Sequence, residues 1–93
     1  MCGIAAILAH SPAAPPVDRA ELPRIRDAMT LRGPDGYGNW FSVDGRVGLG
    51  HRRLSIIDLS PTGAQPMQNQ DGTLVVTFNG ELYNYRELRA ALL

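Results

Sequence analysis

Hydrophobic and polar positions along the chain predict four strands. Residues 3–9 form a short apolar run rich in small and β-branched side chains, which is typical of a buried strand. Residues 39–43 and 46–50 flank Asp44-Gly45, a dipeptide that favours a two-residue hairpin turn. Residues 73–78 form another strongly β-forming run.

Helical spacing of apolar residues predicts a helix in the first half of the chain, where positions 22, 25, 28 and 29 share one face. Asp18 and Glu21 resemble a capping box. Pro23 would then lie beyond the first turn, so a start near Glu21 or Leu22 is the alternative. Gly33-Pro34 ends this helix and forces a turn.

A second helix is predicted over residues 82–88, where Asn84 and Glu87 have the spacing of a capping box. Asn79-Gly80 separates this helix from the strand at 73–78. A strand–loop–helix junction exposes backbone amides, and Asn79 adds a side-chain amide donor. Two donors directed at one point can hold an oxyanion, although an ordinary Asn-Gly turn explains the same residues.

Two loops have a composition that suggests more than a simple connection. Residues 32–38 contain three glycines, one cation and one carboxylate, which would let the main chain approach a ligand closely. An ordinary turn is the alternative. Residues 59–70 form a polar, proline-bearing loop that is long enough to lie across a pocket, and Asp71-Gly72 then turns the chain.

Residues 51–58 are predicted to be extended and to enter the interior. Two adjacent arginines precede the apolar part of this segment, and a guanidinium group needs a partner when it is buried. For Arg52 we expect a surface salt bridge. His51 is expected to be a packed strand residue, because no second metal-type residue stands at ligand spacing.

Composition narrows the function classes. The 93 residues form one domain at most, and 44% of them are hydrophobic, as in a globular protein. Nine basic and nine acidic residues balance, so no basic surplus favours nucleic acid or an anionic membrane. The apolar start lacks the basic flank of a signal peptide and is too short for a membrane span. The single cysteine excludes an internal disulfide and fits a reducing cytoplasm.

That cysteine, Cys2, follows the initiator methionine. If Met1 is removed, as we expect before a small residue, Cys2 carries both a thiol and a free α-amine. An α-amine with a pKa near ~7.7–8.0 can accept the thiol proton, so no histidine partner is required. The alternative is that Cys2 is only a small hydrophobic residue at a frayed terminus.

Five motifs occur in the same order as in class II glutamine amidotransferases, and the chain most resembles the N-terminal glutaminase domain of glutamine-hydrolysing asparagine synthetases. The motifs are Cys2-Gly3-Ile4, Arg32-Gly33-Pro34-Asp35-Gly36, Arg53-Leu54-Ser55-Ile56-Ile57-Asp58, Gly63-Ala64-Gln65-Pro66 and Asn79-Gly80-Glu81-Leu82-Tyr83-Asn84. The resemblance implies an α+β fold, the Ntn-hydrolase αββα sandwich. Residues 1–93 would be the N-terminal part of such a domain.

The resemblance also implies roles for individual residues. Cys2 would attack the carboxamide of L-glutamine and release ammonia through a thioester, while the Asn79 side chain and the Gly80 N–H form the oxyanion hole. Arg53 would bind the α-carboxylate and Glu81 the α-ammonium, and Arg32 and Gly33 would belong to a loop over the pocket. The full glutamine-binding set would be Arg53, Leu54, Ser55, Ile56, Ile57, Asn79, Gly80 and Glu81.

Two departures from the family pattern qualify this reading. Leu31 stands where the family usually has histidine, and the chain ends at Leu93, before the rest of the glutaminase domain and a synthetase domain. We expect that absent domain to use ATP and Mg²⁺ to amidate aspartate, whereas residues 1–93 hold no metal or cofactor. The alternatives are an amidotransferase for a sugar or peptide acceptor, and an inactive fragment or binding module. A homodimer also stays open.

Overall fold

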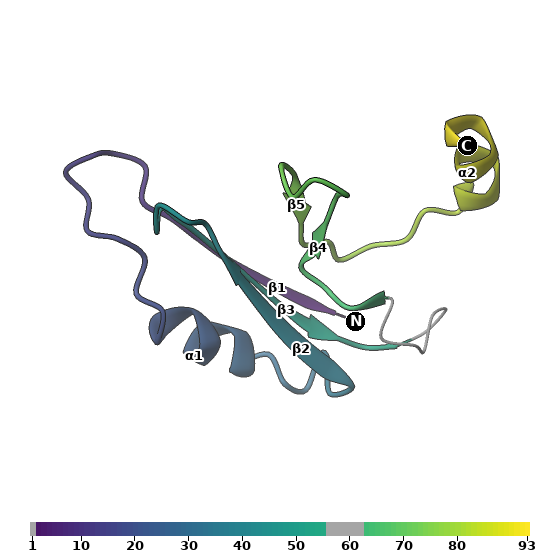
Figure 1. The fold of residues 1–93 in the computed structure, drawn as a ribbon. Coiled ribbons are helices and arrows are strands. Elements are labelled where there is room, and N and C mark those ends of the chain that lie inside the picture. The colour runs from purple at the N-terminus through teal and green to yellow at the C-terminus, as the bar shows by residue number, and fades with distance from the viewer. Residues whose placement is uncertain (1, 56–62) are drawn as a thin grey trace.

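The computed structural model describes residues 2–55 and 63–93, and within these ranges it contains two antiparallel sheets and two helices (Figure 1). This arrangement confirms the α+β class. In chain order the elements are β1 (Gly3–Leu8), α1 (Glu21–Asp27), β2 (Gly36–Phe41), β3 (Val47–Arg53), β4 (Met67–Gln68), β5 (Val75–Val76) and α2 (Tyr85–Leu92).

The larger sheet has the strand order β1-β3-β2, so β3 is its centre. The predicted hairpin is confirmed, but its turn is longer than the predicted two residues: the Ser42 N–H donates to the Val47 carbonyl over 2.9 Å, so residues 43–46 connect the strands, and Gly45 has a φ of 71°. The hairpin strands are longer than predicted. β2 begins at Gly36 and β3 continues to Arg53, because the two residues pair with each other at the far end of the ladder.

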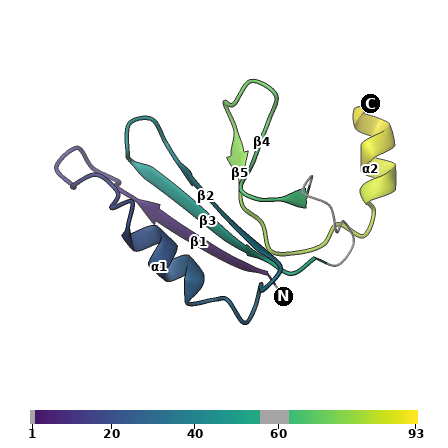
Figure 2. The same cartoon turned by 60° about the horizontal axis from the view of Figure 1, so that its bottom comes forward.

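Helix α1 covers one face of this sheet (Figure 2). The small apolar core lies beneath it and consists of Ala5, Val17 and the fully buried Leu22. The start at Glu21 confirms the alternative that Pro23 suggested, since the Asp18 carboxylate accepts from the Ala20 N–H, at 2.8 Å, in the turn before the helix. The helix was predicted to continue to Gly33-Pro34, but it ends at Asp27. Hydrogen-bonded turns follow it.

Alternation along β3 gives the sheet two different faces. Gly50 and Arg52 lie on the side of α1, where Gly50 approaches Arg26 and Arg52 contacts Asp27. His51 lies on the other side, where its ring contacts the chain after β5. We call the first side the helix face and the second side, which also carries Arg53, the open face.

The smaller sheet pairs β4 with β5 on the side of the large sheet away from α1 (Figures 1 and 2). The predicted turn before β5 is confirmed, since Gly72 has a φ of 73° and its N–H donates to the Asn69 carbonyl. The prediction of a strand over 73–78 was too long, because β4 offers β5 only two partners. The predicted loop at 59–70 contains β4, and its residues 59–62 lie outside the described residues.

Helix α2 begins at Tyr85, three residues later than predicted. Asn84 is its N-cap residue, as the capping box suggested, but the Asn84 side chain makes no capping hydrogen bond. Among the described residues α2 packs against no other helix or strand and buries none of its side chains (Figure 1). Neither helix of the described ranges has the length and apolar character needed to cross a membrane.

Candidate active site

The Cys2 sulfur lies at the end of β3. The N–H of Leu54 donates to Cys2 Sγ over 3.3 Å, and Sγ is 3.7 Å from the carbonyl oxygen of the same residue. The pairing of Gly3 with Arg52 brings these two segments together, because the next residue outward on each strand is Cys2 and Arg53. The only cysteine of the chain is therefore held beside the Arg53-Leu54-Ser55 motif, and its side chain is only partly exposed.

The glycine-rich loop lies against the same strand end. Arg32 Nε donates to the carbonyl oxygen of Cys2 over 3.4 Å. The Asp35 N–H donates to the Arg53 carbonyl and the Ser55 N–H donates to Asp35 Oδ2, both over 2.9 Å. This loop thus connects the main chain at Cys2 with the main chain on both sides of Leu54, the residue that contacts the sulfur.

Gly33 allows the loop to come this close. A Cβ atom at Gly33 would lie 2.6 Å from the backbone nitrogen of Arg53, so any larger residue would push the loop away from β3. The carbonyl of Gly33 also accepts a 2.9 Å hydrogen bond from Arg52 Nε. The interpretation of Arg52 as a surface salt bridge is wrong: its side chain is buried and pairs with Asp27 Oδ1 at 3.3 Å on the helix face.

Arg53 also lines a pocket of about 80 Å³. This volume can hold a small polar group such as a carboxylate, whereas complete small-molecule sites usually reach roughly 300–1,000 Å³. The guanidinium-bearing residue in its wall can bind a carboxylate through two parallel N–H donors. Its lining residues are Asp35, Gly36, Tyr37, His51, Arg53, Ala64 and Gln65.

His51 is 1% exposed and is a packed strand residue, as predicted. Its Nε2 lies 3.1 Å from the carbonyl oxygen of Phe78, so Nε2 carries the proton and donates. The other ring nitrogen, Nδ1, is buried and has no hydrogen-bond partner within residues 2–55 and 63–93. Burial lowers the pKa of His51 below its ordinary value, because a charged ring would bury a second N–H group, and the nearby Arg53 acts in the same direction.

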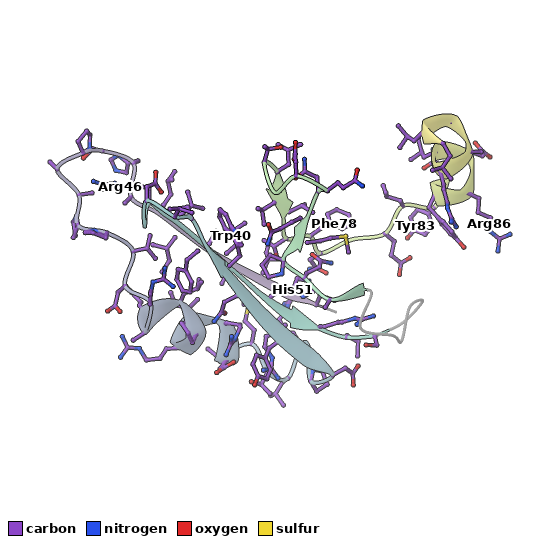
Figure 3. The ribbon with its side chains drawn as sticks, in the orientation of Figure 1. Trp40, Arg46, His51, Phe78, Tyr83 and Arg86 are labelled. Carbon is purple, nitrogen blue, oxygen red and sulfur yellow. The ribbon has the colours of Figure 1, made fainter. Side chains whose placement is uncertain are left out.

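The predicted oxyanion residues follow Phe78 directly. A Cβ atom at Gly80 would lie 2.7 Å from the Phe78 ring, so Gly80 packs closely on that ring. Figure 3 shows Phe78 beside His51, with the chain then running toward Tyr83. The hydrogen bond to His51 therefore attaches the segment before Asn79 to the open face, and the Asn79 side chain is only partly exposed.

The structure brings most of the predicted site residues to one end of the sheet. Cys2, Arg32, Gly33, Arg53, Leu54 and Ser55 form one connected cluster. Asn79 and Gly80 join the open face through Phe78, whereas Glu81 is exposed and no described contact joins it to this cluster. Ile56 and Ile57 lie outside the described residues.

Sequence reasoning did not include His51, Gln65 or Asp35 among the site residues. Each of them lines the pocket beside Arg53. The two motifs Gly63-Ala64-Gln65-Pro66 and Arg32-Gly33-Pro34-Asp35-Gly36 already contained Gln65 and Asp35, so the ordered motifs were the available signal. The packing of His51 was predicted, but its contact with Phe78 joins residues 27 positions apart, and no local pattern reveals that contact.

Comparison with known proteins identifies the family. The model of the glutamine amidotransferase domain matches residues 1–93. The chain belongs to the glutamine amidotransferase domain family. Asparagine synthetase [glutamine-hydrolyzing] 2 of Bacillus subtilis is 45% identical over 95 residues, and amidase chry2 of Gibberella zeae is 45% identical over 100 residues. Asparagine synthetase [glutamine-hydrolyzing] 1 of Bacillus subtilis is 44% identical over 93 residues.

Each of these alignments covers 99% of this chain but only 12% to 15% of the relative. The chain thus spans less than a fifth of the length of these glutamine amidotransferase relatives, and their complete activities extend over far more sequence. No solved structure gives a significant match. The relatives include proteins named as synthetases and as an amidase, so the shared segment is common to proteins with different names.

Proposed function

We propose that this chain forms the nucleophile end of a glutaminase site, in which Cys2 attacks L-glutamine. The carrying observation is the position of the Cys2 sulfur, 3.3 Å from the Leu54 N–H and beside Arg53. A sulfur held by the main chain has a fixed direction of attack. Family membership gives the reaction class, and the pocket beside Arg53 gives a place for the amino acid end of the substrate.

The proposed reaction has two steps. The α-amine of the mature N-terminus accepts the Cys2 thiol proton, and the sulfur attacks the δ-carbon of glutamine. The resulting oxyanion is held by the Asn79 amide group and the Gly80 N–H, the C–N bond breaks, and the proton leaves with nitrogen as ammonia. A water molecule then hydrolyses the γ-glutamyl thioester, which yields glutamate and restores the thiol.

Substrate binding in this proposal relies on Arg53 and Glu81. A planar guanidinium group can bind the α-carboxylate with two hydrogen bonds, and a carboxylate attracts the α-ammonium group. Leu54, Ser55, Ile56 and Ile57 would contribute main-chain contacts. Arg32 and Gly33 would cover the pocket and exclude water until the thioester has formed, and the hydrogen bond from Arg32 to the Cys2 carbonyl is consistent with that position of the loop.

The wider assignment extends beyond these residues. We propose that the ammonia serves an asparagine synthetase, with aspartate as acceptor and with ATP and Mg²⁺ used by a synthetase domain. The similarity to the two Bacillus subtilis synthetases supports this choice, while the similarity to an amidase keeps another acceptor as an outcome to test. An Ntn-hydrolase αββα sandwich, a cytoplasmic location and a homodimer remain parts of the same proposal.

Ammonia release from glutamine tests the proposal in the purified native protein. Cys2→Ala is expected to abolish release, whereas Ala6→Ser, a change of similar size at an exposed position of β1, should retain most of it. A matched assay with added ammonium salt, aspartate and ATP separates loss of the glutaminase from loss of folding, since ammonia bypasses Cys2. Equal release of ammonia by Cys2→Ala and the unmodified protein would end the proposal.

A further inference from the structure

Phe78, the residue before Asn79-Gly80, is held by hydrogen bonds at both its N–H and its carbonyl group. The Phe78 N–H donates to Gln65 Oε1 over 2.6 Å, and the Phe78 carbonyl accepts from His51 Nε2 over 3.1 Å. One residue earlier, Thr77 Oγ1 donates to the Gly50 carbonyl over 3.3 Å. These bonds hold a stretch that belongs to neither sheet ladder.

The two side chains that hold Phe78 are themselves held in register. Gly38 on β2 lies opposite His51 on β3. A Cβ atom at Gly38 would overlap the carbonyl oxygen of Gln65, so the absence of a side chain lets the Gln65 main chain lie directly on the sheet. The cross-strand pair of Gly38 and His51 therefore contributes to both hydrogen bonds of Phe78. His51 donates to the Phe78 carbonyl, and Gly38 leaves room for Gln65, whose side chain accepts from the Phe78 N–H.

The same support reaches the next two residues. The carbonyl of Phe78 and the N–H of Asn79 belong to one planar peptide unit, so the bond from His51 also fixes the orientation of the Asn79 backbone. The Phe78 ring lies under Gly80, where a Cβ atom would be 2.7 Å away. The positions of Asn79 and Gly80 are thus set by contacts that neither residue makes with the sheet directly.

We propose that Gln65 and His51 are positioning residues for the oxyanion hole, because together they fix the Phe78 peptide that carries Asn79 and Gly80. This inference rests on the proposed function, in which these two residues stabilise the negative charge. It gives the Gly63-Ala64-Gln65-Pro66 motif a role: the motif supplies the acceptor for the Phe78 N–H. It also gives a role to the buried His51 beside the pocket, whose Nε2 donates to the Phe78 carbonyl.

A positioning role predicts a larger effect on turnover than on binding. Gln65→Met removes the acceptor at nearly constant length, and we expect kcat for glutamine hydrolysis to fall at least about tenfold while KM changes less than about threefold. Gln65→Glu keeps an oxygen acceptor and should restore kcat to within about threefold of the unmodified protein. Gln70→Met, in an exposed turn, is the matched control and should change neither constant.

A second measurement reports the oxyanion directly. An aldehyde analogue of glutamine adds to the Cys2 thiol and forms a tetrahedral oxyanion or hemithioacetal without further reaction, so its affinity depends on the hole. Gln65→Met should weaken its binding at least about tenfold, whereas the rate of Cys2 alkylation by iodoacetamide, which forms no oxyanion, should stay within about twofold. Thermal unfolding of each variant identifies the temperature range in which all are folded.

The outcomes separate this inference from the proposed function. If Cys2→Ala keeps full activity, the proposed function fails and the positioning role fails with it. If Cys2→Ala is inactive while Gln65→Met keeps kcat and aldehyde affinity, only the positioning role is overturned. The positioning role is also overturned if Gln65→Glu is as slow as Gln65→Met, since restoring the acceptor would then have no effect.

Discussion

Adjacent arginines on β3 show how differently the two faces of one sheet are used. Arg52 points to the helix face, where it is 8% exposed and donates to the Gly33 carbonyl and to Asp27. Arg53 lies on the open face and lines the pocket of about 80 Å³. A strand reverses its side-chain direction at every residue, so neighbouring residues of the same type can serve stability and binding separately.

The helix face satisfies its charges internally. Arg26 is as buried as Arg52, and both donate to the Asp27 carboxylate, which also has its pKa lowered, mainly by the hydrogen bond from Arg26. Arg26 also binds Asn39 Oδ1 over 2.6 Å and lies 4.4 Å from the centre of the Tyr37 ring. Such a cluster of hydrogen bonds specifies how α1, β2 and β3 fit together.

The open face is arranged differently. It combines a pocket, a buried ring nitrogen of His51 that no described residue pairs with, and the sulfur of Cys2 at one end of the sheet. Polar groups in a recess are costly unless something pairs with them, and a polar substrate is one such partner. The contrast shows that the helix face is occupied by charged groups bound to other parts of the protein, whereas the open face carries the pocket and the sulfur.

The largest expected effect belongs to Arg53. Arg53→Ala should raise KM for glutamine at least about thirtyfold, since removing one member of a charged hydrogen-bonded pair costs roughly 2 kcal/mol or more. Steady-state ammonia release measures this change. The matched variant Arg52→Met should leave KM within about threefold. Similar KM values for Arg53→Ala and the unmodified protein would break the proposed division between the faces.

The next effect is on stability and belongs to Arg52. Arg52→Met removes the donor to the buried Gly33 carbonyl and one of the donors to Asp27, so the free energy of unfolding should fall by about 1–3 kcal/mol. Asp27 is half exposed, which keeps the loss below that of a fully buried pair. Urea denaturation measures the difference, and Arg24→Met on the exposed side of α1 should change it by less than about 0.5 kcal/mol.

A smaller effect concerns His51 and pH. The pKa of His51 is lowered from 6.5 in the folded protein, so the unfolded chain takes up a proton first as the pH falls. The contribution of His51 to stability is therefore present above pH 6.5 and is lost as the pH falls from there through the folded-state pKa, by at most about 1.4 kcal/mol per pH unit. Unfolding curves between pH 8 and pH 5 should show this slope, and His51→Gln should remove it.

The smallest effect is expected at Leu31, where the family usually has histidine. Its side chain is 99% exposed, so Leu31→His should change the free energy of unfolding by less than about 0.5 kcal/mol. KM for glutamine should stay within about twofold. A clear gain in turnover would mean that the residue at position 31 acts on the loop over the pocket, and position 31 would then belong to the functional open face.

The local parts of the fold could be predicted from the sequence. The strand at 3–9, the hairpin around Asp44-Gly45 and the helix start after Asp18 depend on nearby residues, and the structure confirms them. The strand at Gly36 was interpreted as loop, because glycines are uncommon in strands and its pairing with Arg53 is distant in sequence. The run at 73–78 overestimated β5 because strand length depends on the partner as well as on propensity.

The site was predictable as a set of motifs but not as a geometry. The motifs named Cys2, Arg53 and Gly33, and the structure brings these residues to one strand end. The burial of Arg52 could not be foreseen, because its partners Asp27 and Gly33 lie 25 and 19 residues away. The roles of Cys2, Arg53 and Gly33 in the reaction stay predictions until they are measured.

Mass spectrometry of the N-terminal peptide tests the central claim most directly. The native protein is mixed with glutamine, quenched in acid within one turnover and digested, and the single cysteine makes the position of any adduct unambiguous. The account predicts a peptide that begins at Cys2 and carries a γ-glutamyl thioester, which disappears in Cys2→Ala. A fully active protein that retains Met1, or that never carries this thioester, would contradict it.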